Sequence, residues 1–297
     1  MKAEADPGGT SPPVIAVSKK DDPTQPEVPD VLSILPVRGM VIFPGTVVPL
    51  SIRRASSLKM LDETLPATKV IGLFTQRIDS DSNPTEDGLY KTGVAGNVLK
   101  LIRQTDDVVL ILVQALKRVR IKKIVSAAPY FRGEIEEIQS VPPAEEDAPW
   151  LARLKNLRDS AIQLLDLTPE VPEQARTMIM NIQDGSQLAD FLASNLNISV
   201  QEKQDLLEEL DVPKRVAAVQ QRLSGQLEIA RLQQKLQEDV ASQISDSQKR
   251  VFLREQIKAI QKELGEGEQG AEEQISELRK RLADAKPPPN VLLQVEK

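Results

Sequence analysis

The stretch VVLILVQALKRVRIKKI, from Val108 to Ile124, decides the fold of the first half of this 297-residue chain. Most of its residues are aliphatic, and many of them are β-branched. From Arg118 to Lys122, basic and apolar residues alternate, which places one row of side chains in solvent and the other against a core. This pattern predicts a long β-strand.

Further strands are predicted on both sides of this stretch. Leu89 to Ile102 has the pattern of a second long strand, and the polar pair Asp106-Asp107 between the two predicts a hairpin turn. Shorter strands are expected at Met40–Phe43, Thr46–Ile52, Val70–Phe74 and Glu134–Glu136, with one short helix at Ser56–Leu65. Several strands with one helix indicate a small, partly open barrel or folded sheet over residues 30–141.

The pattern becomes helical after an acidic hinge that begins at Pro142. Apolar residues then recur at helical steps in several short segments, with Ser186 as one candidate N-cap. Ser199 and Glu202 have the spacing of a capping box, in which each side chain binds the backbone N–H of the other residue. Residues 142–210 are therefore predicted to form a helical subdomain.

A single long helix is predicted over residues 211–265. Pro213 is tolerated in a first turn, apolar residues continue as far as Leu264, and no further proline interrupts them. At about 1.5 Å per residue this helix would extend ~75 Å, so much of it is expected to project from the domains before it. Its apolar positions drift from a heptad repeat, which argues against a long two-stranded coiled coil.

The two ends of the chain are expected to lie outside these domains. Residues 1–29 contain six prolines and few large apolar groups, so they cannot bury enough surface to offset their ordering entropy and are predicted to be a disordered tail. Residues 266–297 are predicted to be a linker with one short helix. No segment has the apolar length of a signal peptide or a membrane span, which predicts a cytoplasmic protein with no membrane partner.

Composition excludes several kinds of chemistry. The chain has no Cys and no His, which removes disulfides, thiolate and imidazole metal ligands, and the Ser-His-Asp and Cys-His nucleophile pairs. Its carboxylates lack the spacing of an EF-hand. We therefore predict no catalytic residue, no cofactor-binding residue and no metal ligand in this chain.

Three short motifs imitate functional sites. Gly265–Gly270 matches G-x-G-x-x-G, but it follows a helix and carries two carboxylates that would repel phosphate, so a helix stop is expected. Ser56–Lys59 and Lys91–Gly93 match the S-x-x-K and K-T-G motifs of serine acyl-transfer enzymes. The two motifs are close together in the sequence with no S-D-N triplet between them, so a surface helix start and a strand entry are expected.

Basic residues gather on the long strand at Arg118, Arg120, Lys122 and Lys123. We expect them to form a solvated face, and a phosphate-binding groove is the alternative. The net charge of −6 and an aromatic content of 3% argue against a nucleic-acid surface over the whole chain. DNA is therefore only a weak candidate partner.

Candidate contact residues fall into two groups. The first group, near the hinge, is aromatic: Tyr130, Phe131 and Trp150. These side chains are expected to pack between domains or, alternatively, to line an exposed apolar cleft for unfolded segments. The second group, on the long helix, is aliphatic: Leu253, Ile257, Ile260 and Leu264. Its 4-3-4 spacing predicts one apolar face, which we expect to dock against neighbouring subunits.

Three stretches resemble the amino-terminal region of the Lon family of ATP-dependent AAA+ serine proteases. The first is ILPVRGMVIFPGTVVPLSIRRASSLKMLDE, Ile34–Glu63. The second is DGLYKTGVAGNVLKLIRQ followed by VVLILVQALKRVRI, Asp87–Ile121, and the third is QKRVFLREQIKAIQKELGE, Gln248–Glu266. Their order and spacing also agree with the family, whereas Ala115 stands where the family usually has Gly.

The resemblance implies an α+β multidomain fold: a PUA-like β domain at 30–141, a helical subdomain at 142–210, and a long projecting helix at 211–265 that leads to an ATPase module starting within 266–297. It implies substrate recognition and hexamer assembly, with unfolded or degron-bearing proteins and further copies of the chain as partners. ATP, Mg²⁺ and Ser-Lys chemistry would belong to modules that this chain lacks. The chain alone is therefore expected not to be an enzyme, whereas the longer protease would degrade misfolded and selected regulatory proteins.

Three rival interpretations remain. PUA-like domains elsewhere hold RNA, so a nucleic-acid binder is one, and tight, steeply salt-dependent binding would favour it. A coiled-coil adaptor is the second, and a stable parallel dimer would favour it. A serine hydrolase is the third, and labelling by an active-site serine probe would favour it.

Overall fold

The structure is a computed structural model that describes residues 26–78, 84–105, 107–145, 147–168, 173–263, 275–281 and 284. The chain divides into two compact units, Met1–Arg231 and Leu232–Lys297. The predictions for residues 1–25, for Gly265–Gly270 and for most of residues 266–297 lie outside the described residues.

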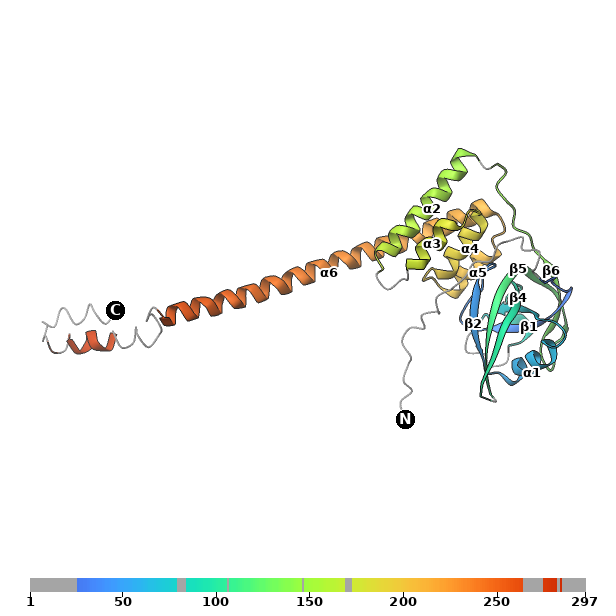
Figure 1. Ribbon diagram of the computed structural model, residues 1–297, viewed down its shortest axis with the longest axis horizontal. Helices are drawn as coiled ribbons and strands as arrows, with labels where there is room; N and C mark the ends of the chain where they lie inside the picture. Colours follow the sequence, from blue (N-terminus) through green and yellow to red (C-terminus); the bar gives the residue numbers. More distant parts are fainter. Residues whose placement is uncertain are drawn as a thin grey trace. The chain divides into compact units, whose positions relative to one another are not determined.

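Six strands of the first unit form one sheet (Figure 1). They are β1 (Val31–Val37), β2 (Val47–Ile52), β3 (Val70–Thr75), β4 (Thr92–Thr105), β5 (Val108–Ser126) and β6 (Arg132–Glu137). The order is β2-β5-β4-β3-β1-β6, and a further pairing of β5 with β6 closes five of the strands into a barrel. The β1–β3 pair is parallel and the other pairs are antiparallel.

Strand β5 makes this closure possible because it has two different partners along one edge. Its first part pairs with β2, from Val109 to Gln114, and its later part pairs with β6, from Val119 to Ser126. Strand β4 pairs with the opposite edge of β5 from Val108 to Arg120. The predicted hairpin between the two long strands is therefore confirmed.

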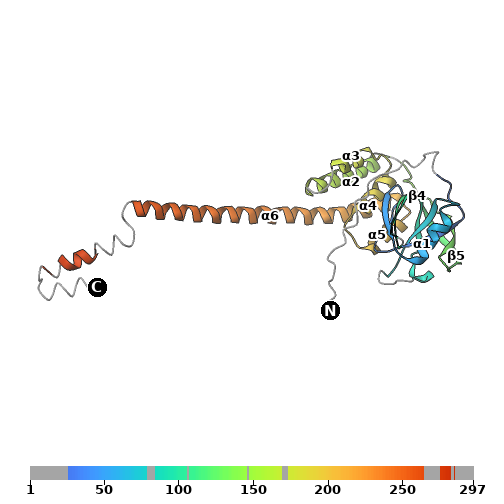
Figure 2. The same cartoon turned by 60° about the horizontal axis from the view of Figure 1, so that its bottom comes forward.

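Five helices follow the sheet. They are α2 (Ala148–Asp166), α3 (Glu173–Asn181), α4 (Gly185–Asn195), α5 (Val200–Glu208) and α6 (Val212–Glu263), whereas the short α1 (Ala55–Thr64) and the turn η1 (Glu86–Gly88) lie between strands. Figure 1 and Figure 2 both show α4 and α5 beside the sheet and α2 beside α3. A sheet domain followed by helices and one long helix confirms the predicted fold class.

Two of the helix caps were tested by the structure. The capping box at Ser199 and Glu202 is present, with both reciprocal hydrogen bonds. The N-cap of α4 is Asp184 rather than the predicted Ser186, because the Asp184 carboxylate accepts a hydrogen bond from the Gln187 backbone N–H at 2.8 Å. Ser186 lies inside the helix and is buried.

The predicted strand at Met40–Phe43 is wrong. These residues form a loop after β1, which turns at Gly39 with φ 69°. Val41, Ile42 and Phe43 are all buried, so their side chains do not alternate between a core and solvent as those of a half-buried strand would. Apolar residues in a loop can fill a core, and a short apolar run does not distinguish the two cases.

The hydrophobic core continues from the sheet into the helices. One cluster contains Ile111 and Val113 of the sheet together with Leu157, Leu188 and Val219 of the helical region. A second cluster, which includes Phe74 and Val119, consists of strand residues and Leu89, which lies just before β4. The sheet and helices α2 to α5 with the start of α6 therefore share one folded unit. No helix in the described ranges is long and apolar enough to cross a bilayer.

The prediction of a solvated basic face is wrong for Arg118. Its side chain is 4% exposed and forms a two-point ion pair with Asp190 of α4. Arg215 of α6 is fully buried, and its Nε atom lies 3.1 Å from the same carboxylate. These partners are far away in the sequence, so the local alternation on the strand gave no sign of them.

Candidate functional site

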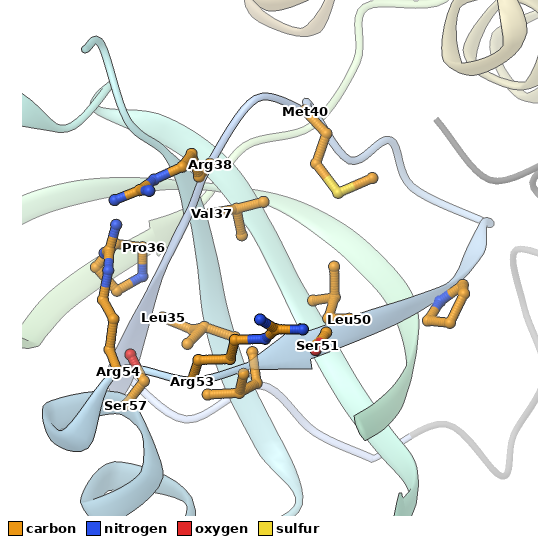
Figure 3. Close-up of a pocket in the computed structure, with 12 residues that line it drawn as sticks. Leu35, Pro36, Val37, Arg38, Met40, Leu50, Ser51, Arg53, Arg54 and Ser57 are labelled. Atoms are coloured by element: carbon orange, nitrogen blue, oxygen red, sulfur yellow. The ribbon is translucent and has the colours of Figure 1, made fainter. Parts of the chain in front are cut away.

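A cavity of about 530 Å³ lies between β1 and β2, as Figure 3 shows. Its walls come from the end of β1, the loop after it, β2 and the start of α1. The lining residues are Leu35, Pro36, Val37, Arg38, Met40, Pro49, Leu50, Ser51, Ile52, Arg53, Arg54 and Ser57. Apolar side chains and three arginines therefore meet in one place.

The β1 side of the cavity is a strand edge. The Val37 carbonyl accepts a hydrogen bond from Gln76 N, on the β3 side, whereas Ile34 N donates to Phe131 O at 2.8 Å on the other side. Backbone groups alternate in direction along a strand, so Pro36 faces the same side as Ile34. The pairing of β1 with β6 covers Val31–Ser33 only, so no described strand pairs with this edge around Pro36.

The β2 side is also an edge. Ala115 N of β5 donates to Thr46 O at 2.8 Å, which turns the backbone groups of Val48, Leu50 and Ile52 toward β5. The backbone groups of Val47, Pro49 and Ser51 therefore point to the opposite edge. Within the described part of the chain, no strand pairs with that edge.

A proline stands at the cavity side of each edge. Proline has no N–H to donate, so it is tolerated where the backbone faces away from the paired neighbour. Pro36 and Pro49 both occupy such positions, and both are partly buried. Prolines on an exposed edge also hinder uncontrolled pairing with other chains. The cavity is therefore bounded by two protected strand edges.

The floor of the cavity is apolar and firmly held. Leu35, Val37, Leu50 and Ile52 are each less than a tenth exposed. Met40 is half-buried, and its loop is fixed by a hydrogen bond of 3.1 Å from the Thr75 hydroxyl to the Met40 carbonyl. A preformed apolar floor favours apolar side chains of a ligand.

The rim of the cavity is cationic. Arg38 and Arg53 are exposed, and Arg54, the N-cap residue of α1, donates a hydrogen bond to the Gln76 side chain. Among the described residues that line the cavity, none is Asp or Glu. Guanidinium groups bind carboxylates in a geometry that few other side chains match. The arrangement can therefore hold a ligand that is apolar along its length and negatively charged at one part.

The predicted aromatic residues lie elsewhere. Trp150 is 6% exposed, and its ring fills the space beside Gly185, whose added Cβ would meet the Trp150 Cζ2 atom at 2.7 Å. Tyr130 packs partly buried against the same cluster, whereas Phe131 packs against the second cluster. None of the three lines the cavity. Contact of these residues with a substrate stays a prediction.

The predicted aliphatic residues of the long helix are exposed. Leu253, Ile257 and Ile260 lie on α6 and are 48%, 54% and 54% exposed, and Leu264 lies outside the described residues. Val251 and Phe252 beside them are exposed as well. This part of α6 belongs to the second unit and presents apolar side chains that no described residue covers.

Basic residues of the other sequence motifs form ion pairs with nearby glutamates. Lys59 of the S-x-x-K motif forms an ion pair with Glu63 at 3.8 Å. On β5, Arg120 and Lys122 lie 3.5 and 3.9 Å from Glu136, so part of the basic stripe is neutralised by β6. In the described ranges, no group of three or more acidic side chains could hold a metal ion.

Sequence reasoning missed the cavity. The signal that could have found it is the position of Pro36 and Pro49 in two otherwise strand-like segments, because proline in a strand indicates an edge. Which strands are edges depends on the pairing order, and that order is known only from the fold.

Comparison with known proteins agrees with this organisation. Residues 31–225 match the family described as the ATP-dependent protease La (LON) substrate-binding domain. The chain is 36% identical over 271 residues to a Lon protease of Dictyoglomus thermophilum, which covers 91% of this chain and 34% of the relative. It is 32% identical over 266 residues to a Lon protease of Flavobacterium johnsoniae, covering 90% of this chain and 32% of the relative. The chain thus spans about a third of the length of these relatives.

A solved structure supports the fold. The N-terminal domain of the Mycobacterium avium complex Lon protease superposes with a TM-score of 0.50 at 20% identity, covering 65% of this chain and 98% of that domain. The match to the family covers most of the described sheet and helices, and the sequence resemblance extends beyond it. The chain belongs to the family of Lon N-terminal substrate-binding domains.

Proposed function

We propose that this chain recognises substrates for a longer ATP-dependent serine protease of the Lon type, and that it binds unfolded or degron-bearing proteins. The match of residues 31–225 to a substrate-binding family carries this proposal. The cavity between β1 and β2 supports it, because its apolar floor and cationic rim form a place where a polypeptide could bind.

The physical properties of the cavity suit weak and general capture. Unfolded proteins expose apolar side chains and free backbone groups without a fixed sequence. An apolar cavity beside two strand edges offers contacts for both the side chains and the backbone groups. Individually weak contacts become effective when several copies act on one client.

Binding of a permanently unfolded, fluorescently labelled protein to the full chain tests the proposal. Met40→Asp places a charge on the apolar lining and should weaken binding on the order of tenfold, which corresponds to about 1.4 kcal/mol. Leu99→Asp is the matched control, because Leu99 is 48% exposed and does not line the cavity. Absence of any binding by the unmodified chain would contradict the proposed function.

We expect peptide-bond hydrolysis, ATP and Mg²⁺ to belong to other parts of such a protease, acting in the cytoplasm. The chain spans about a third of its relatives, which supports this division of roles. Incubation of the full chain with ATP, Mg²⁺ and an unfolded protein should therefore give no cleavage products, and their appearance would contradict this expectation.

Self-association through α6 is a second proposed role. The observation that favours it is the apolar, exposed surface of Leu253, Ile257 and Ile260. Exposed apolar patches of this kind are typical of interaction sites. We expect this surface to contact neighbouring copies in an assembled hexamer.

Charge substitutions test this second role in a longer Lon protease that carries this region. Ile257→Asp combined with Ile260→Asp should shift the assembly to smaller species in sedimentation velocity. Lys258→Asp, on the same turn of α6, is the control because it changes charge without removing an apolar group. Unchanged assembly of the double variant would contradict the proposal.

A further inference from the structure

We infer that an extended substrate segment binds between β1 and β2 as an added β-strand, hydrogen-bonded to β2 and with a carboxylate at the arginine rim. This inference rests on the proposed function, since it assumes that the chain binds unfolded polypeptides. It names the form in which they bind and the chemistry that they must carry.

The free edge of β2 supplies the hydrogen-bonding groups. Val47 and Ser51 each present one N–H and one carbonyl to the cavity side, and Pro49 between them presents a carbonyl only. An incoming strand needs such alternate donors and acceptors along one edge. Ser51 is exposed, so a peptide can reach its backbone.

The cavity in front of this edge has room for side chains. In an added strand, alternate side chains point to one face, so every second residue of the peptide would point toward the floor formed by Leu35, Val37 and Leu50. The residues between them would point to solvent. The occupant is therefore an extended segment with apolar residues at alternate positions.

Charge complementarity adds a second requirement. Arg53 lines the cavity with an exposed side chain, beside Arg38 and Arg54, and none of the described lining residues is acidic, so a segment with Asp, Glu or a C-terminal carboxylate is favoured over a basic one. Recognition through the backbone also explains how clients without a common sequence could bind to one site, because the backbone is the part that they share.

The two prolines limit the strength of this pairing. Pro49 withholds one donor from the peptide, and Pro36 withholds one from the β1 side. Each missing hydrogen bond lowers affinity, so the peptide is held weakly enough to be released. Pro49→Ala should therefore strengthen binding about threefold to tenfold, because it adds an N–H at the free edge.

Substitutions at Ser51 test strand addition directly. The probe is a fluorescent peptide of alternating valine and threonine with glutamates at one end, titrated against the full chain. Ser51→Pro removes the N–H that faces the peptide and leaves the pairing with β5 intact, so it should weaken binding about threefold to tenfold. Ser51→Ala removes only the hydroxyl and should bind as the unmodified chain does. Circular dichroism of both variants verifies that the sheet is retained.

Two changes in the probe complete the test. Methylation of alternate backbone nitrogens, in the register that faces β2, should weaken binding, whereas methylation of the other set should not. Replacement of the glutamates by lysines should weaken binding at low salt, and Arg53→Glu should reverse this preference. Equal binding of both methylated peptides, or equal effects of Ser51→Pro and Ser51→Ala, would overturn the inference.

The outcomes separate this inference from the proposed function. If an unfolded protein binds but Ser51→Pro has no specific effect, substrate recognition stands and strand addition fails. If Ser51→Pro changes only the self-association of the chain and not peptide binding, the free edge pairs with a second copy and the inference is overturned. If neither the peptide nor the unfolded protein binds, both proposals fail.

Discussion

Arg118 on β5 and Asp190 on α4 form a two-point ion pair, in which Nη1 lies 2.8 Å from Oδ2 and Nη2 lies 2.6 Å from Oδ1. Arg215 approaches the same carboxylate, so one negative charge faces two buried positive charges. Burial lowers the pKa of Arg215, and Asp190 opposes this shift. Further donors of the two guanidiniums bind backbone carbonyls of Leu207 and Glu209.

Removal of the Asp190 carboxylate, which both arginines share, should strongly destabilise the fold. Asp190→Ala leaves two buried guanidiniums without their counter-charge, which is expected to lower the free energy of unfolding by about 3–5 kcal/mol. Chemical denaturation followed by circular dichroism measures this change. Asp62→Ala, which removes the exposed ion pair of Arg103, is the control and should change stability by less than about 1 kcal/mol. Equal effects of the two substitutions would refute this account of the buried network.

Two glycines should respond in opposite ways to added bulk. Gly185→Val places atoms within 2.9 Å of both Trp150 and Leu154 in the core, so it should lower the free energy of unfolding by about 1–3 kcal/mol. Gly225→Ala on α6 meets nothing within 4 Å and should raise it by about 0.5–1 kcal/mol, because alanine is the better helix former. Thermal unfolding of both variants measures these changes in stability. A stabilised Gly185→Val would contradict the packing around Trp150.

The capping box of α5 predicts an acid-sensitive contribution to stability. Hydrogen bonds from the hydroxyl and backbone N–H of Ser199 lower the pKa of Glu202 below its ordinary value of 4.5. A carboxyl whose pKa is lowered by folding stabilises the fold above that ordinary value, and this contribution is lost as the pH falls through the lowered pKa. Urea denaturation should show the unmodified chain to be more stable than Glu202→Gln at neutral pH, with the difference vanishing in acid. A difference that persists in acid would show that ionisation of Glu202 is not its cause.

The hydroxyl of Thr75 should control the loop that carries Met40. Thr75→Val removes the hydrogen bond to the Met40 carbonyl, at a cost of about 1 kcal/mol. Amide hydrogen exchange over residues 38–46 should become faster, while exchange in β4 and β5 stays the same. Unchanged exchange in the loop would mean that other contacts hold it.

The sequence predicted the elements that depend on local patterns. The long hairpin of β4 and β5, the capping box of α5 and the start of α6 near Pro213 follow from periodicity, capping and proline placement. The pattern failed at Met40–Phe43, where a loop buries its apolar side chains, and at Arg118, whose partner lies 72 residues away. The cavity was missed because an edge exists only relative to the pairing order of all strands.

Strand β5 takes part both in the closure of the barrel and in the ion pair between Arg118 and Asp190. Because β2 and β6 share one edge of β5, and Arg118 lies between the stretches that they pair with, the register of β5 sets which way that guanidinium points. A slip by one residue would turn Arg118 away from Asp190 and would exchange the inner and outer faces of the strand. The pairing of the hairpin and the attachment of the helices therefore depend on one register, so the barrel and its helical neighbour are expected to melt together rather than in sequence.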